Sequence, residues 1–163
     1  MVEPMRMDIT KLAPDAYKHL AALEQTVAGK LDRQLYHLIK LRASQINGCA
    51  FCIGMHSDEA LRDGDKAERL LLLDAWQESS AFSDKERAAL EWVEEITRIS
   101  ETHASEEAFD GLKRFFSEEE ICYLTLAAAL INTWNRIAIS SRAQYDRQMF
   151  HQRLSEVKVA EPA

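Results

Sequence analysis

The sequence predicts an all-α protein, and three observations support this fold class. Glycine and proline are scarce, with 5 and 3 among 163 residues, so the chain offers few favoured positions for turns. Apolar residues recur at helical spacing along nearly the whole chain, whereas no segment shows the sustained alternation of a half-buried strand. The length corresponds to one domain, and the 47% hydrophobic and 29% charged residues are typical of a globular protein.

Start and stop signals divide the first half of the chain into helices. Gly29 ends the first helix, Asp32 is a suitable N-cap for the second, and Gly48 separates the second from the third. Asp65 with Glu68 is a variant of the capping box and opens a fourth, short helix. The helices expected in this half span residues 15–28, 32–47, 49–62 and 65–76.

Three further helices are expected in the second half. Ser83 with Glu86 and Ser117 with Glu120 are capping boxes, in which the two side chains satisfy each other's backbone N–H groups at a helix start. Ser105 is a candidate cap for a short helix between them. These helices are expected at residues 83–99, 105–111 and 121–141.

The last of these helices is the most apolar segment of the chain. Its leucine, isoleucine and alanine residues between positions 124 and 131 cover most of the circumference, so they cannot all face one neighbour. Such a helix is expected in the middle of a bundle or at a subunit interface, and we therefore predict a homo-oligomer. Cys122 of the same helix is predicted to be a buried, inert thiol.

Charge and the terminal segments limit the classes of function. With 20 basic and 27 acidic residues the net charge is −7, which disfavours general nucleic-acid binding because acidic groups repel phosphate. Residues 1–14 lack the apolar core of a signal peptide and are expected to form an N-terminal arm. No apolar stretch approaches the ~20 residues of a membrane span. We expect a cytoplasmic protein without membrane binding, with one domain over residues 15–150 and a polar tail over 151–163.

A C-x-x-C sequence followed by a histidine is the candidate site. At about 100° per helical residue, Cys49, Cys52 and His56 fall within a sector of about 60°. Gly48 places the thiols at a helix N-terminus, where free N–H groups and the helix dipole stabilise a thiolate. His56 can accept a proton from Cys52, and the spacing lets one cysteine resolve a sulfenic acid formed on the other. The pattern therefore favours thiol redox chemistry.

Two other interpretations of these residues stay open. The cysteines can be buried small residues without chemistry, or they can form part of a zinc site with His56 and a fourth ligand such as Cys122 or His37. The thioredoxin class also uses C-x-x-C, but there the motif follows a strand, and no strand is expected here. We expect neither a metal nor a cofactor.

A longer stretch carries a family resemblance. Residues 38–52, LIKLRASQINGCAFC, together with Met55 and His56, resemble the core motif of the alkylhydroperoxidase D (AhpD)-like proteins of the carboxymuconolactone decarboxylase superfamily. Residues 131–138, INTWNRIA, resemble the closing helix of the same group. The resemblance extends over about residues 10–150, and this core motif is far more specific than C-x-x-C alone.

The resemblance implies an AhpD-like helical bundle that assembles into trimers or hexamers. It implies a thiol peroxidase that reduces organic hydroperoxides with electrons from a thiol or protein reductant. It also assigns Cys52 as the peroxide-attacking cysteine, Cys49 as the resolving cysteine, and His56 as part of a proton relay. The residues by themselves leave the order open, because the helix terminus favours Cys49 as the more acidic thiol whereas His56 favours Cys52.

Two positions depart from the family pattern. The relay of the family often includes a glutamate twelve residues before the first motif cysteine, and this position is His37 here. His37 can accept a proton in the relay, or it can simply pack on its helix; Glu24 or Glu59 could supply the carboxylate, but nothing in the sequence places them there. Gly54 stands where an acidic or larger residue is common, and marks either local looseness or a close approach.

These departures leave two alternative functions open. The first is a redox-sensing or stress-response oligomer, in which the cysteine pair forms a disulfide without efficient turnover. The second is decarboxylation of a lactone, the other named activity of the superfamily. Members with that activity do not rely on C-x-x-C, so the motif disfavours it.

Overall fold

The computed structural model describes residues 3–146 and 148, and the predicted tail at 151–163 lies outside this part. All regular elements among the described residues are helices, which confirms the all-α class. None of them is long and apolar enough to cross a membrane. In chain order they are α1 (Ile9–Leu12), α2 (Pro14–Ala28), α3 (Arg33–Asn47), α4 (Ala50–Arg62), α5 (Ala67–Leu72), the 3-10 helix η1 (Leu73–Glu78), α6 (Asp84–Thr97), α7 (Ile99–Thr102), α8 (Glu106–Lys113) and α9 (Glu118–Ser141).

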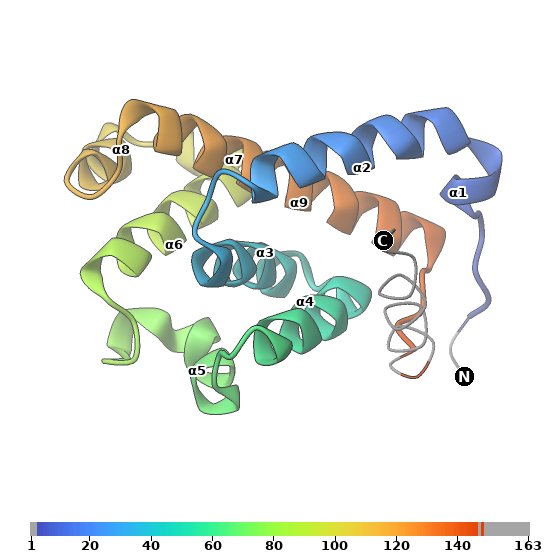
Figure 1. The fold of residues 1–163 in the computed structure, drawn as a ribbon, viewed down its shortest axis with the longest axis horizontal. Coiled ribbons are helices and arrows are strands. Elements are labelled where there is room, and N and C mark those ends of the chain that lie inside the picture. Colours follow the sequence, from blue (N-terminus) through green and yellow to red (C-terminus); the bar gives the residue numbers. More distant parts are fainter. Residues whose placement is uncertain (1–2, 147, 149–163) are drawn as a thin grey trace, which may run out of the picture.

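Helix α3 is the centre of the fold, with α4, α6 and α9 packed around it (Figure 1). Residues 35–44 are all buried, so the middle of α3 has no solvent-facing side. His37, Lys40 and Arg42 lie in this stretch. Buried charged groups are stable only when partners compensate them, and the partners of these side chains shape the site described below.

The hydrophobic core lies on two sides of α3. Ile39 packs into a large cluster shared with α6 and α9, which also contains the side chains of Cys49 and Cys52. Leu38 and Leu41 pack into a smaller cluster with α5, η1 and α6. Each fully buried aliphatic side chain contributes roughly 1.5–3 kcal/mol. Because α3 is held from both sides, the turn that follows it is firmly positioned.

The capping signals locate most of the helices correctly. Both predicted capping boxes are present at the starts of α6 and α9, and the expected side-chain caps begin α3 and α8. The prediction for Asp65 is wrong, because α5 begins at Ala67. The backbone N–H of Asp65 still donates to the carbonyl of Ala60 at 3.0 Å, in the turn that closes α4. Its carboxylate instead forms an ion pair with Arg69 at 2.9 Å.

Helix α9 is not the middle of the bundle. One side packs against α3 and α6, whereas Leu126 and Ile139 on other sides are 42% and 47% exposed. The prediction of a buried Cys122 is wrong, since this residue lies away from the core and is exposed. An apolar composition alone could not tell which side of the helix faces the core. The predicted homo-oligomer stays a prediction.

Gly54 marks a close approach rather than local looseness. The segment after α9 returns to α4, where the ring of Tyr145 lies so close to Gly54 that a Cβ atom there would overlap it. The Tyr145 hydroxyl donates to the carboxylate of Asp58, and its ring meets Phe51 edge-to-face with centroids 6.2 Å apart. A side chain at position 54 would therefore displace this segment from the helix that carries the cysteines.

The packing of Tyr145 predicts an unusual response to a glycine substitution. In the middle of a helix, alanine is normally more favourable than glycine by about 1 kcal/mol. We expect Gly54→Ala to lower the free energy of unfolding instead, by on the order of 1–2 kcal/mol, because the methyl group overlaps the ring. Gly111→Ala in α8, where a Cβ would meet open space, is the matched control and is expected to stabilise the protein.

Urea denaturation of the two variants measures the difference. In a Tyr145→Ala background, Gly54→Ala is expected to become stabilising, because the ring that it would meet is gone. If the two glycine substitutions had the same effect in the otherwise unchanged protein, the proposed contact would be wrong.

Candidate active site

The turn between α3 and α4 places the first cysteine. Gly48 ends α3 with φ +67°, a left-handed conformation that is costly for residues with a Cβ. The next residue, Cys49, is the N-cap of α4, and its backbone N–H donates to the carbonyl of Ser44 at 3.0 Å. The Cys49 sulfur accepts a hydrogen bond from the backbone N–H of Cys52 at 3.4 Å. A thiol thus takes the position that serine or aspartate usually holds at a helix start.

The two thiols form a reduced, hydrogen-bonded pair. Their Sγ atoms lie 2.7 Å apart, further than the about 2.05 Å of a disulfide, and both residues are 1% exposed. The hydrogen bond from the Cys52 thiol lowers the pKa of Cys49 to about 7, although burial opposes this. The same hydrogen bond, together with burial, raises the pKa of Cys52. Both shifts favour Cys49 as the more acidic thiol of the pair.

A group of amides fixes this turn against α9. The Asn47 side-chain amide donates to Asn132 Oδ1 at 3.0 Å and to Asn135 Oδ1 at 2.8 Å. Asn135 is fully buried and donates to the hydroxyl of Ser44 at 3.0 Å. Its amide contributes to the lowered pKa of Cys49 and opposes part of the rise in the pKa of Cys52. The amides therefore join the two segments on which the family resemblance rests.

His56 and Glu59 form a pair on the next turns of α4. The His56 Nδ1 lies 2.7 Å from Glu59 Oε2, and because a carboxylate only accepts, Nδ1 carries the hydrogen. His56 is 1% exposed, and burial lowers its pKa, so the ring is neutral at pH 7. Its Nε2 is then an acceptor, and it has no hydrogen-bond partner among the described residues. His56 follows Cys52 by four residues on α4, so this acceptor lies on the face of the helix that carries the thiol.

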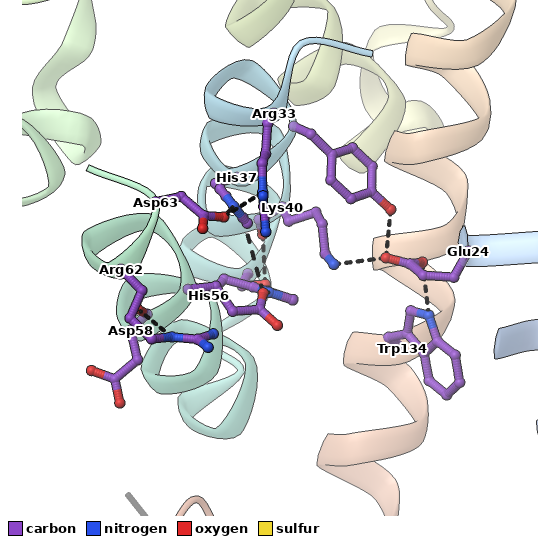
Figure 2. Close-up of polar contacts among 12 residues, drawn as sticks. Glu24, Arg33, His37, Lys40, His56, Asp58, Arg62, Asp63 and Trp134 are labelled. Atoms are coloured by element: carbon purple, nitrogen blue, oxygen red, sulfur yellow. Dashed lines mark hydrogen bonds and ion pairs between the residues drawn. The ribbon is translucent and has the colours of Figure 1, made fainter. Parts of the chain in front are cut away.

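His37 lies on the other side of Glu59. Its Nε2 is 2.6 Å from Asp63 Oδ2, and the same carboxylate pairs with the exposed Arg33 at 2.7 Å (Figure 2). Its Nδ1 lies 4.0 Å from Glu59 Oε2 and has no hydrogen-bond partner among the described residues. Burial raises the pKa of Glu59, but the hydrogen bond from His56 and the nearby charges, Lys40 among them, together outweigh it and lower this pKa to about 2. A carboxylate thus lies between two histidines, of which one follows the cysteines on α4 and the other pairs with Asp63.

Glu24 compensates the buried charge of Lys40. The Lys40 ammonium lies 2.7 Å from Glu24 Oε1, and Glu24 also accepts hydrogen bonds from the Tyr36 hydroxyl and from the Trp134 indole N–H at 3.0 Å (Figure 2). Burial raises the pKa of Glu24, but Lys40 and the hydrogen bonds from Tyr36 and Trp134 together outweigh it, and the net shift is downward. Of the two glutamates considered from the sequence, Glu59 rather than Glu24 is therefore the one that contacts a histidine.

The charge of Lys40 extends to the rest of the site. It lowers the pKa of Glu59 and of His56, and it also acts to lower that of Cys52. Lys40 was not predicted as a site residue. Arg33, His37, Lys40 and Ser44 share one face by helical spacing, so the sequence alone indicates a polar, solvent-facing side and gives no signal for the burial of Lys40.

A cavity of about 270 Å³ adjoins the thiol pair. Its wall includes Gly48, Cys49 and Phe51 on one side and Ala138 and Ile139 of α9 on the other. Cys49 is among the residues that line this wall, and Cys52 is not. A small molecule in the cavity would therefore meet Cys49 first.

The four predicted site residues thus form two pairs. Cys49 and Cys52 touch directly, whereas His37 and His56 meet through Glu59. Among the described residues, no three His, Cys, Asp or Glu side chains are arranged to hold a metal ion. The zinc interpretation therefore finds no ligand set in this part of the chain.

The fold and the site define a class of helical dithiol protein of the AhpD type. The model of the carboxymuconolactone decarboxylase family matches residues 14–95. The uncharacterized protein YdfG of Bacillus subtilis is 38% identical over 136 residues, which cover 83% of this chain and 92% of that protein. The chain therefore belongs to the carboxymuconolactone decarboxylase family, and the resemblance found in its motif is confirmed.

Solved structures agree with this assignment. A protein of unknown function from Agrobacterium tumefaciens, ATU0492, described as a candidate antioxidant defence protein AhpD, is 45% identical with a TM-score of 0.85, over 88% of this chain and 99% of that chain. The apo debrominase Bmp8 is 24% identical with a TM-score of 0.72, over 82% of this chain and 73% of its own. At that identity Bmp8 shows a shared fold only.

The hydrogen bond between the thiols predicts the acidity of Cys49. In a Cys122→Ser background, which removes the exposed third thiol, we expect the iodoacetamide reaction of Cys49 to rise with pH about a midpoint near 7. In Cys52→Ala the S–H donor is lost, and the midpoint should move up toward the ~8.5 of a free cysteine. Mass spectrometry of the alkylated peptide checks which sulfur reacts. An unchanged midpoint in Cys52→Ala would contradict the hydrogen-bond explanation.

Proposed function

We propose that the protein is a thiol-dependent peroxidase that reduces organic hydroperoxides through a dithiol–disulfide cycle of Cys49 and Cys52. The observation that carries this proposal is the buried cysteine pair at the start of α4, with Cys49 among the residues that line a cavity and a neutral histidine on the same helix. The antioxidant-defence description of the Agrobacterium relative supports the same class of activity.

The first step belongs to Cys49. Its thiolate attacks the terminal oxygen of the hydroperoxide, so that an S–O bond forms while the O–O bond breaks, and the sulfur gives up two electrons. The departing alkoxide takes a proton from water in the cavity and leaves as the alcohol. Cys49 is then a sulfenic acid. The helix N-terminus and the Cys52 thiol stabilise the attacking thiolate.

The second step belongs to Cys52. The Cys52 proton passes through a water molecule to Nε2 of His56, which has no direct hydrogen-bond partner among the described residues, and the resulting thiolate attacks the sulfur of the sulfenic acid. An S–S bond forms, and the hydroxide takes the proton from His56 and leaves as water. The two sulfurs already lie 2.7 Å apart, so the step needs little movement. An external dithiol then reduces the disulfide by exchange and returns the pair to its starting state.

This order is the reverse of the one that the family resemblance implies. Two features support it: Cys49 lines the cavity, and the pKa of Cys49 is lowered whereas that of Cys52 is raised. The role of His56 is kept in both versions, since it takes the proton of Cys52. Glu59 holds its ring in the required tautomer, and His37 lies on the far side of that carboxylate.

The alternative function, a redox-sensing or stress-response oligomer, has less support from the structure than from the sequence. It was motivated by the missing relay glutamate, but Glu59 supplies a carboxylate to His56 from α4. Lactone decarboxylation needs neither thiol, so it would survive substitution of both cysteines.

We also propose a homo-oligomer, a trimer or hexamer, acting in the cytoplasm. The exposed apolar side chain of Leu126 in α9 supports an assembly that covers this part of the helix.

The proposed cycle predicts that both cysteines are required. With cumene hydroperoxide and dithiothreitol, we expect Cys49→Ser and Cys52→Ser each to lose at least about 100-fold in kcat/KM, while Cys122→Ser stays close to the unsubstituted protein. Consumption of the hydroperoxide is the measurement. Full activity in both cysteine variants would exclude the proposal. Stoichiometric disulfide formation without turnover would favour the sensor.

A trapping experiment decides the order of the two cysteines. One equivalent of hydroperoxide should leave a sulfenic acid on Cys49 in Cys52→Ser, and dimedone labelling with peptide mass spectrometry detects it. Much less label is expected on Cys52 in Cys49→Ser. The opposite result would restore the order that the resemblance implies.

The carboxylate between the histidines predicts a graded loss of rate. Glu59 raises the pKa of His56, so Glu59→Gln leaves a weaker base, and we expect kcat to fall about 10–100-fold. His37→Gln should have a smaller effect, because His37 acts on the far side of Glu59. Glu107→Gln, an exposed site on α8, is the matched control. Steady-state kinetics at pH 7 measure the loss, and equal rates in Glu59→Gln and Glu107→Gln would contradict the assigned role.

A further inference from the structure

One wall of the cavity beside Cys49 carries a cation. Arg142 lies at the end of α9 and lines the cavity together with the apolar side chains of Phe51, Ala138 and Ile139. Among the described residues on this wall, Arg142 is the only one with a positive charge. A molecule in the cavity would thus meet a thiol, an apolar surface and one guanidinium.

The backbone at Arg142 is unusual for an arginine. Its φ is 57°, in the left-handed region, and its N–H closes α9 by donating to the carbonyls of Ala138 and Ile139. Glycine is the favoured residue at such a position because a Cβ makes this conformation costly. The helix end thus holds a side chain that its backbone geometry disfavours. Residues in strained conformations often serve the function of a site rather than its stability.

The guanidinium of Arg142 already forms an ion pair with a carboxylate of the same chain. Arg142 pairs with Glu3 at 2.8 Å, and Glu3 also lines the cavity. The Glu3 side chain is 69% exposed, and the Arg142 side chain is 32% exposed. An ion pair with so exposed a carboxylate is weak, and a competing carboxylate can replace it. Glu3 therefore shows where a carboxylate can bind Arg142. This position belongs to the same cavity that Cys49 lines.

We propose that the cavity selects small organic hydroperoxides that carry a carboxylate, with Arg142 as the anion-binding residue and Glu3 as the group that the substrate displaces. This inference rests on the proposed peroxidase function and names its substrate class. The apolar wall accommodates the carbon skeleton between the two ends, and the hydroperoxide end meets the Cys49 thiolate. A cavity of about 270 Å³ suits a molecule the size of a substituted benzene and is too small to enclose a long lipid chain.

A matched pair of substrates tests the selectivity. Cumene hydroperoxide is neutral, and its para-carboxylate derivative differs by one charged group. In the unsubstituted protein, kcat/KM is expected to be higher for the carboxylate than for the neutral compound. In Arg142→Gly this ratio should fall about tenfold, which corresponds to about 1.4 kcal/mol of lost transition-state binding. Glycine fits the left-handed backbone, so this variant keeps the helix end intact.

Three further variants separate charge from other effects. Arg142→Lys keeps the cation and is expected to retain most of the ratio. Glu3→Gln removes the competing carboxylate and should raise the ratio about two- to threefold. Arg114→Gln, at an exposed arginine that does not line the cavity, should leave it unchanged. Thermal unfolding of each variant verifies that the proteins are folded.

These measurements distinguish a failure of the selectivity inference from a failure of the peroxidase proposal. If the protein reduces cumene hydroperoxide but the ratio is the same in Arg142→Gly, the selectivity inference is wrong and the peroxidase proposal stands. If the protein reduces neither compound, both fail. A ratio that falls in Arg142→Gly and rises in Glu3→Gln supports the inference, and an equal fall in Arg114→Gln would overturn it.

Discussion

The left-handed turn at Gly48 is the constraint on which the site depends. Because α3 is buried on all sides up to residue 44, its end cannot shift, and the turn sends the chain directly into α4. Cys49 thereby becomes the N-cap of α4 and lies against the Cys52 thiol. Asn47 and Asn135 hold the same turn against α9. A residue with a Cβ at position 48 would strain the turn and disturb all of these contacts.

Buried charge decides which groups of the site hold protons. Lys40 lies inside the protein beside Glu24, and its positive charge favours the carboxylate of Glu59 and the neutral form of His56. A neutral imidazole whose Nδ1 hydrogen is engaged by a carboxylate has one free acceptor atom, which is the requirement for a base. The contact between the two thiols lowers the pKa of Cys49 and raises that of Cys52. The low-dielectric interior makes each of these interactions stronger than it would be at the surface.

The position of the relay carboxylate shows how a site can differ from its family pattern. The sequence has His37 on α3 where a glutamate is common, and this substitution suggested a damaged relay. In the structure Glu59, from α4, lies between His37 and His56. Sequence spacing places Glu59 only three residues from His56, which is a neighbouring position on one helix. The link to His37 crosses from one helix to another, and spacing carries no information about such contacts.

The sequence by itself determined the helices, most of their caps, the turn at Gly48 and the cysteine–histidine motif, because these depend on interactions between residues close in the chain. The tertiary structure decided which sides are buried. It placed Cys122 at the surface, moved the centre of the bundle to α3, and explained Gly54 by the approach of Tyr145. It also brought Lys40 and Glu24 together inside the protein. These outcomes depend on packing between distant segments, which no local pattern encodes.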